Sequence, residues 1–229
     1  MYVLAVVAAG LGLAFGAPVQ GQKPTELALF TGAQEDLAAN WVRRGTDQAA
    51  AWKVENSAMI VGGGDIATRA TFSDFHLHIE FRTPNMPNAK GQAKGNSGIG
   101  LLGRYEIQVL DSYGIEPPGT GDCGSVYGQA AALTNACKPP MEWQTYEIIF
   151  RAPRLGDDGA MLAKPIVTVI QNGVVVQNNV VLEAMTGIQS AAERQISKTG
   201  PIVLQDHGNR VEYRNIRIRA LPAKGADKY

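Results

Sequence analysis

The strongest constraint on the fold is an alternation of apolar and polar residues with a period of two. Every second residue from Phe75 to Phe81 is apolar, and polar residues lie between them. Because successive side chains of a β-strand point to opposite faces, this pattern predicts a strand with one buried and one exposed face. The segments 105–110, 143–150 and 211–219 show the same alternation. The chain is therefore expected to contain several half-buried strands.

The clearest turn between two strands is Asn172-Gly173, which lies between the apolar runs 166–170 and 174–176. Asn and Gly tolerate positive φ at both central positions, as a type I′ hairpin turn requires. The sequence therefore predicts a hairpin here. In the last strand the alternation slips near Asn215 and then resumes, which predicts a β-bulge.

The pattern as a whole favours an all-β fold. The length of 229 residues allows one large β domain or two small ones, and a hydrophobic content of 45% excludes a disordered chain. No segment gives a convincing helix, although Gln34–Asn40 and Ser190–Gln195 each allow a short helical turn. Many short strands separated by Gly, Pro and Asn turns are typical of a β-sandwich or jelly roll.

The N-terminal segment differs from the rest of the chain. Residues 1–19 contain no charged side chain and include a long apolar run. This pattern is typical of a secretory signal, although the usual basic residues before the apolar run are missing. We expect residues 1–22 to be removed and residues 23–229 to form one domain with no stable membrane insertion. A membrane anchor is the alternative, but the run contains Gly and Pro and is marginal in length for a spanning helix.

The charge balance narrows the kind of partner. The chain has 21 basic and 21 acidic residues and no basic run. Nucleic acid and anionic membrane surfaces are therefore not expected as partners, and a small uncharged ligand is favoured.

Two cysteines, Cys123 and Cys137, lie in one stretch rich in Gly and Pro. An exported protein reaches an oxidising compartment, so a disulfide between them is expected. Two free buried thiols are the alternative. Neither a CxxC spacing nor an adjacent His supports metal binding by this pair.

Polar side chains on two predicted strands are candidates for a binding wall. Glu106 and Gln108 share one strand face, and Asp111 ends that strand, whereas Glu80 and Arg82 share a face of another. If the two faces converge, their carboxylates, amide and guanidinium suit the paired hydroxyls of a sugar. Aromatic residues that can stack on a sugar are Tyr105, Tyr113, Tyr127 and Trp143. The alternative is a set of solvated or ion-paired positions on an exposed sheet face.

The histidines differ in their surroundings. His207 follows an apolar strand and precedes a Gly-Asn turn, where a neutral imidazole can act as general acid or base. Asp206 would point the opposite way on an extended strand, so it need not orient His207. A histidine that only holds the turn is the alternative. His76 and His78 are two residues apart on one predicted strand, a spacing that can bind a metal ion. No third ligand is evident, so we expect both side chains to lie on an exposed polar face of the strand.

Common catalytic and nucleotide-binding motifs are missing from the sequence. It contains no P-loop, no GxGxxG and no HExxH. It also lacks the GxSxG turn of the α/β-hydrolases. These absences argue against phosphate-loop, dinucleotide, zinc-protease and serine-esterase chemistry.

Several short motifs occur in a characteristic order, and together they resemble the 3-keto-disaccharide hydrolase domain family over roughly residues 25 to 221. These motifs include Gly95-Asn96-Ser97-Gly98-Ile99, Tyr105-Glu106-Ile107-Gln108-Val109-Leu110-Asp111, Val126-Tyr127-Gly128-Gln129, Glu142-Trp143-Gln144 and Leu204-Gln205-Asp206-His207-Gly208-Asn209. The resemblance implies a concanavalin/LamG-like jelly-roll β-sandwich of a single domain. It also implies an exported bacterial protein, secreted or periplasmic.

The resemblance further implies action on glycosides whose sugar has been oxidised to a ketone at C3. Such a ketone acidifies the C2 hydrogen, so a base can remove it, the C1 aglycone can leave, and water can then add. On this hypothesis His207 or Glu106 transfers protons. The residues expected to bind substrate are Glu80, Arg82, Asn96, Gln108, Asp111, Tyr127, Trp143, Gln205 and Asp206.

Two points stay open at this level. A divalent metal could polarise the ketone, with Glu106, Asp111 and His207 as available ligands, but nothing in the spacing demands one. Because the same fold hosts lectins and binding modules, a non-catalytic carbohydrate-binding module is the alternative function. A structural cell-surface domain is a third interpretation.

Overall fold

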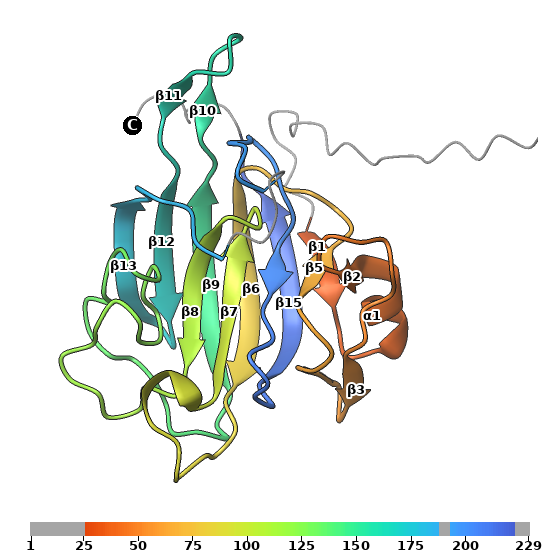
Figure 1. Ribbon diagram of the computed structural model, residues 1–229, viewed down its shortest axis with the longest axis vertical. Helices are drawn as coiled ribbons and strands as arrows, with labels where there is room; N and C mark the ends of the chain where they lie inside the picture. The colour runs from red at the N-terminus through yellow and green to blue at the C-terminus, as the bar shows by residue number, and fades with distance from the viewer. Residues whose placement is uncertain (1–25, 188–192, 223–229) are drawn as a thin grey trace, which may run out of the picture.

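The computed structural model describes residues 26–187 and 193–222. In this part of the chain two antiparallel sheets pack face to face, with β7 and β8 lying in front of the larger sheet (Figure 1). The fold is the all-β jelly-roll sandwich that the sequence predicts. The expected signal segment, residues 1–22, lies outside the described residues.

The larger sheet, called the large sheet below, has eight strands in the order β13-β12-β9-β6-β15-β4-β3, with β1 also paired to β15. Its strands are β1 (Glu26–Phe30), β3 (Lys53–Glu55), β4 (Ala58–Ile60), β6 (Phe75–Arg82), β9 (Gln144–Arg151), β12 (Ile166–Gln171), β13 (Val174–Val181) and β15 (Glu212–Ala220).

The second sheet, called the small sheet, has five strands in the order β2-β5-β14-β7-β8. Its strands are β2 (Trp41–Arg43), β5 (Ile66–Thr68), β7 (Asn96–Leu101), β8 (Tyr105–Leu110) and β14 (Val203–Leu204). A separate hairpin and two short helices complete the described part, namely β10 (Arg154–Leu155), β11 (Met161–Ala163), α1 (Gln34–Asn40) and the 3₁₀ helix η1 (Gly91–Ala93).

The core lies between the two sheets, and the predicted alternation decides which side chains fill it. The four apolar residues of β6, from Phe75 to Phe81, are fully buried, as are Ile107 and Val109 of β8. Phe81 also packs on Tyr146 of β9 at 4.8 Å between ring centroids. Full burial of a large apolar side chain contributes about 1.5–3 kcal/mol, so these inner faces hold the sheets together.

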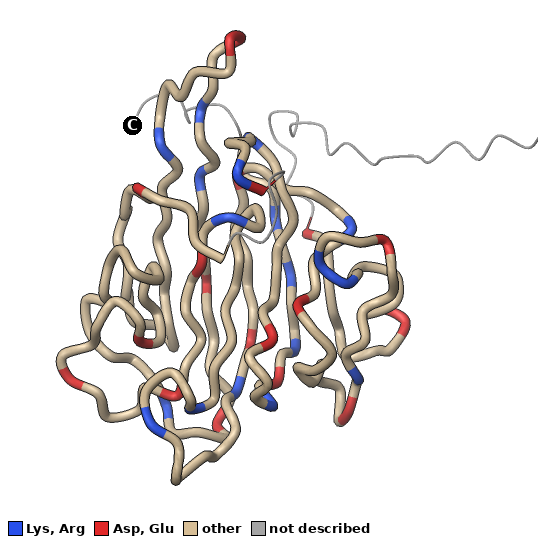
Figure 2. The backbone as a smooth tube through the Cα atoms, in the orientation of Figure 1, with Lys and Arg blue, Asp and Glu red and all other residues tan. Residues whose placement is uncertain are grey.

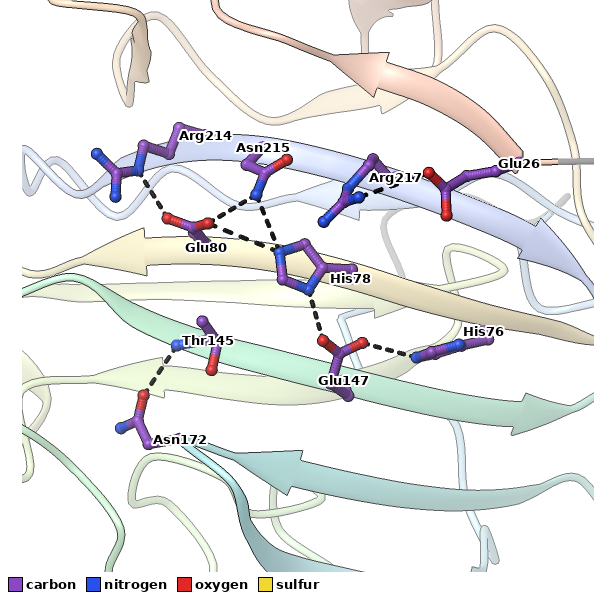
Figure 3. Close-up of polar contacts among 10 residues, drawn as sticks. All are labelled: Glu26, His76, His78, Glu80, Thr145, Glu147, Asn172, Arg214, Asn215 and Arg217. Carbon is purple, nitrogen blue, oxygen red and sulfur yellow. Dashed lines mark hydrogen bonds and ion pairs between the residues drawn. The ribbon is translucent and has the colours of Figure 1, made fainter.

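The predicted hairpin and bulge are both confirmed. Asn172 and Gly173 have φ values of 51° and 83°, and the turn joins β12 to β13. In β15 the pairing with β6 shifts between Arg214 and Arg217, and Asn215 has a φ of 50°. Because of this extra residue, Arg214 and Asn215 both reach the same neighbour, as Figure 3 shows.

Two short helical turns were expected from the sequence, and the structure describes one of them in full. The short helix expected at Gln34–Asn40 is confirmed as α1, which buries Leu37 in the core. The expected turn at Ser190–Gln195 lies partly outside the described residues. Among the described residues, no helix has the length and apolar character that crossing a membrane requires.

Cys123 and Cys137 are free thiols in the structure, and no bond joins them. The two sulfurs nevertheless share a donor, because Gln171 Nε2 lies 3.6 Å from Cys123 Sγ and 3.3 Å from Cys137 Sγ. Cys123 is buried, so it is screened from external reagents. The disulfide expected from the sequence stays a prediction.

Oxidation of this pair is expected to stabilise the fold. A disulfide that closes a loop of this length contributes about 3 kcal/mol by limiting the unfolded chain, which raises the melting temperature by about 6–12 °C. The measurement is thermal unfolding of the oxidised protein with and without reductant. Cys137→Ser is the control and should show no reductant effect. Two titratable thiols in the unfolded, non-reduced protein would contradict the prediction.

Candidate active site

The outer face of the small sheet carries the polar residues that the sequence singled out. Glu106 and Gln108 of β8 point away from the core because Ile107 and Val109 fill it. β7 lies beside β8 with Gly98 opposite Gln108. On the other side of β7, β14 ends at Leu204, and the next residue continues along the same face. Two motifs far apart in the sequence therefore meet on one surface.

Glu106 and His207 are joined through a single amide side chain. Gln205 donates a hydrogen bond to the Glu106 carboxylate. Its Oε1 lies 2.9 Å from His207 Nε2. Gly98 makes this contact feasible, because a Cβ at that position would lie 2.4 Å from Gln205 Oε1 and 2.8 Å from Glu106 Oε1. The structure thus brings together the two residues predicted for proton transfer.

More amides line the same face. Gln108 is buried, and in the amide orientation that satisfies its neighbours Nε2 donates to Glu106 Oε1 at 3.0 Å and to Ser97 O at 2.9 Å. Asn96 donates through Nδ2 to Gln92 O at 2.9 Å. The carboxylate of Glu106 therefore lies among neutral hydrogen-bond donors rather than beside a directly bonded cation.

The surroundings of Glu106 change its acidity. Only 6% of the residue is exposed, and this burial raises the pKa of its carboxyl group. The hydrogen bond from Gln205 and the charge of Arg44 oppose the rise, whereas the charge of Asp65 adds to it. A carboxyl group with a raised pKa exchanges protons closer to neutral pH, which suits a general acid or base.

A loop that covers the Glu106 carboxylate is held by contacts that no sequence motif indicates. Glu106 N donates to Thr186 Oγ1 at 2.8 Å, and the next residue, Gly187, lies above the carboxylate. Arg44 is buried, forms an ion pair with Asp65 at 3.0 Å and donates to Gly187 O. Neither Arg44 nor Asp65 belongs to a recognisable motif, because each acts through contacts made between distant segments.

Three other predicted residues lie around this centre. Asp111 is buried at the end of β8 and pairs with Lys94 at 2.8 Å. Tyr127 is half-buried, and its backbone N donates to Glu106 O. Asp206 instead accepts from the backbone of Gly64 and Gly208, both at 2.8 Å, so it holds the turn rather than His207. The expectation that Asp206 does not orient His207 agrees with these contacts.

Glu80, Arg82 and Trp143 do not join this site. β6 and β8 belong to different sheets and bury their apolar faces against each other, so their polar faces point in opposite directions. The expected convergence of these two faces is therefore not found. On the large sheet Glu80 pairs with Arg214 at 2.7 Å, as Figure 3 shows, and the Arg214 guanidinium lies 4.0 Å from the centre of the Trp143 ring. These residues match the alternative, an ion-paired sheet face.

His76 and His78 also lie on the outer face of the large sheet. Each contacts a different oxygen of Glu147, at 2.7 Å and 2.6 Å (Figure 3). Within residues 26–187 and 193–222, no group of three His, Cys, Asp or Glu side chains is placed to hold a metal ion. The trio of Glu106, Asp111 and His207 is thus not gathered as a set of ligands.

Comparisons with known proteins agree with this architecture. The family model described as a 3-keto-alpha-glucoside-1,2-lyase-like domain matches residues 27–219. The chain belongs to this family. The membership confirms the family that the ordered motifs indicated. No curated protein matches the chain significantly.

Solved structures share the family fold. A candidate glycosyl hydrolase from Parabacteroides distasonis is 40% identical, with a TM-score of 0.77 over 86% of this chain and 84% of that one. A second candidate glycosyl hydrolase from the same organism is 20% identical, with a TM-score of 0.62 over 86% and 94% of the two chains. An alginate lyase at 9% identity and a TM-score of 0.51, over 87% and 98%, shares the fold alone.

The raised pKa of Glu106 predicts a pH-dependent contribution to stability. A group whose pKa is higher in the folded state stabilises the fold below its unfolded value, here 4.5, and loses that contribution as pH rises through the folded pKa. The Glu106→Gln side chain cannot ionise, so this variant does not lose stability at that position as the pH rises. The unfolding free energy of the variant should therefore rise relative to the wild type between pH 4.5 and neutral pH. Denaturant titrations at several pH values test this, and a constant difference would contradict it.

Proposed function

We propose that this protein cleaves glycosides whose sugar ring carries a ketone at C3. Family membership supports a glycoside-related function. The observation that supports action on 3-keto-glycosides is the hydrogen-bonded connection of Glu106, Gln205 and His207 on one amide-lined face. This arrangement places an imidazole and a carboxyl group with a raised pKa on either side of one amide, and the elimination requires a base and an acid. The ligand is accordingly a small, uncharged carbohydrate derivative. Acidic and basic residues are interspersed over the sandwich (Figure 2), which fits such a ligand.

The proposed reaction proceeds in two stages. In the first, a base removes the C2 proton, the electron pair forms an enolate with the C3 ketone, and the C1–O bond then breaks to release the aglycone as an alcohol. In the second, water adds to C1 of the unsaturated sugar and a proton returns to C2. The sum is hydrolysis, and each stage needs a base, an acid and donors for the enolate oxygen.

The side chains are assigned roles by their exposure and partners. His207 is exposed, so it can reach the substrate and accept the C2 proton. Glu106 is buried and has a raised pKa, so it can store and return a proton. Asn96 contacts the sugar hydroxyls through its amide, whereas Gln108 uses both amide hydrogens on Glu106 Oε1 and Ser97 O and so holds the carboxylate. Asp111, just after β8, and Tyr127, whose backbone lies beside Glu106, are further sugar contacts. Arg82, Glu80 and Trp143 have no part in this proposal because they lie on the opposite face.

We also propose that the protein is exported to the periplasm or the medium. The support is the uncharged apolar segment before Pro18 and the pair of cysteines in one loop. On this proposal residues 1–22 act as a signal and residues 23–229 form the mature protein.

The decisive experiment uses a 3-keto-glucoside with a chromogenic aglycone, with and without a chelator. Release of the aglycone is expected from the keto substrate and not from the unoxidised glucoside. His207→Ala and Glu106→Gln should each lower kcat by about 10²–10⁴-fold, which is the usual contribution of general acid–base catalysis. Glu147→Gln, on the opposite face, is the control and should keep full activity.

A carbohydrate-binding module without turnover is the other outcome of this experiment. It would give saturable sugar binding, no aglycone release from either anomer, and little effect of Glu106→Gln. Trp143 would then be the natural stacking residue, but the Arg214 guanidinium already covers its ring. This contact favours the enzyme.

A further inference from the structure

Gln205 lies between the two proton-transfer groups and is held by both its backbone and its side chain. Its backbone is fixed on both sides, because Gln205 N donates to Gly98 O at 3.0 Å and Gln205 O accepts from Ser97 Oγ at 2.7 Å. Only 7% of the residue is exposed. Its amide also lies against two glycines, where a Cβ would approach to 2.4 Å at Gly98 and 3.1 Å at Gly187. This amide therefore has little freedom to rotate or to follow a substrate.

The Gln205 amide has an NH₂ group that donates hydrogen bonds and an oxygen that accepts them. Its orientation toward Glu106 therefore decides which of the two faces His207. The ionised Glu106 carboxylate only accepts hydrogen bonds, and Gln205 donates to it, so in this state the Gln205 NH₂ group faces Glu106. Its oxygen then faces His207 Nε2 at 2.9 Å, and an amide oxygen only accepts. His207 Nε2 must therefore carry a hydrogen. In the neutral imidazole the other nitrogen, Nδ1, is left unprotonated.

We propose that Gln205 is a positioning residue that holds neutral His207 in the Nε2–H tautomer and so makes Nδ1 the basic nitrogen. Resting on the proposed function, this assigns Nδ1 as the atom that accepts the C2 proton of the substrate. The proton moves from C2 to Nδ1 while the electron pair of the C–H bond enters the enolate. Nε2–H stays bonded to Gln205 throughout and steadies the imidazolium that forms.

This role differs from the sugar contact expected of Gln205 from the sequence. A residue that binds substrate equally before and during reaction changes KM, whereas one that orients the base changes kcat. The Gln205 amide is already bonded to two side chains and enclosed by two glycines. Gln205 should therefore affect kcat.

The chain offers a direct test because it contains only three histidines. Long-range ¹H–¹⁵N NMR of full-length protein labelled at histidine reports the tautomer of each ring. At a pH where His207 is neutral, the wild type should show it as the Nε2–H form alone. Gln205→Met keeps the length of the side chain but removes both polar atoms, so His207 should become a mixture of tautomers.

Two controls separate orientation from loss of structure. His76 and His78 are held by Glu147 on the other sheet, so their signals should not change in Gln205→Met and should report an intact fold. Gln205→Glu keeps an oxygen facing His207 and should retain the Nε2–H form. The kcat of Gln205→Met should be lower than that of the wild type by a factor on the order of 100, with KM little changed.

Three results would overturn the proposal. These are an Nδ1–H tautomer in the wild type, an unchanged tautomer in Gln205→Met, or a raised KM with unchanged kcat. The NMR result needs no substrate, so it stands or fails independently of the activity on 3-keto-glycosides. A confirmed tautomer without turnover would overturn the proposed function and leave the positioning role.

Discussion

The alternation of side chains along β8 is the constraint on which both the core and the site depend. Ile107 and Val109 are fully buried between the sheets, and this burial fixes the direction of every other residue of the strand. Glu106 and Gln108 must then point to the outer face, where β7 and the end of β14 meet them. The candidate site is therefore held in place by the same contacts that stabilise the sandwich.

The candidate site contains a carboxyl group, Glu106, whose burial disfavours its ionised form. Glu106 is 6% exposed, and its neighbours are amides rather than a bonded cation. Such a group lowers stability at neutral pH but gains a pKa suited to proton transfer. Arg44 and Thr186 hold the covering loop and so maintain this environment. The surroundings of Glu106 therefore depend on contacts from the loops as much as on the strand.

Much of the fold could be predicted from the sequence because its signals are local. The alternation in β6, the turn at Asn172-Gly173 and the slip at Asn215 each depend on neighbouring residues alone, and each is confirmed. Strands β2 and β5 have only three residues each, which is too short to show a period. Their place in the small sheet is set by distant pairing.

The placement of the candidate site residues could be predicted in part, for a related reason. Glu106 and His207 lie in distinctive motifs, and the structure brings them together through Gln205. The sequence could not decide which sheet each polar face belongs to, so Glu80 and Arg82 were grouped with a face on the other side of the molecule. Sheet membership depends on long-range pairing, which an alternating pattern does not encode.

Deuterium incorporation is the most direct test of whether the protein removes the C2 proton of a 3-keto-glycoside. The reaction is run in D₂O, and the position of deuterium in the released sugar is read by NMR against the same keto sugar incubated without protein. We expect enzyme-dependent deuterium at C2 that is lost in His207→Ala. Release of the aglycone with hydrogen retained at C2 would contradict the account, since it would mean direct displacement at C1.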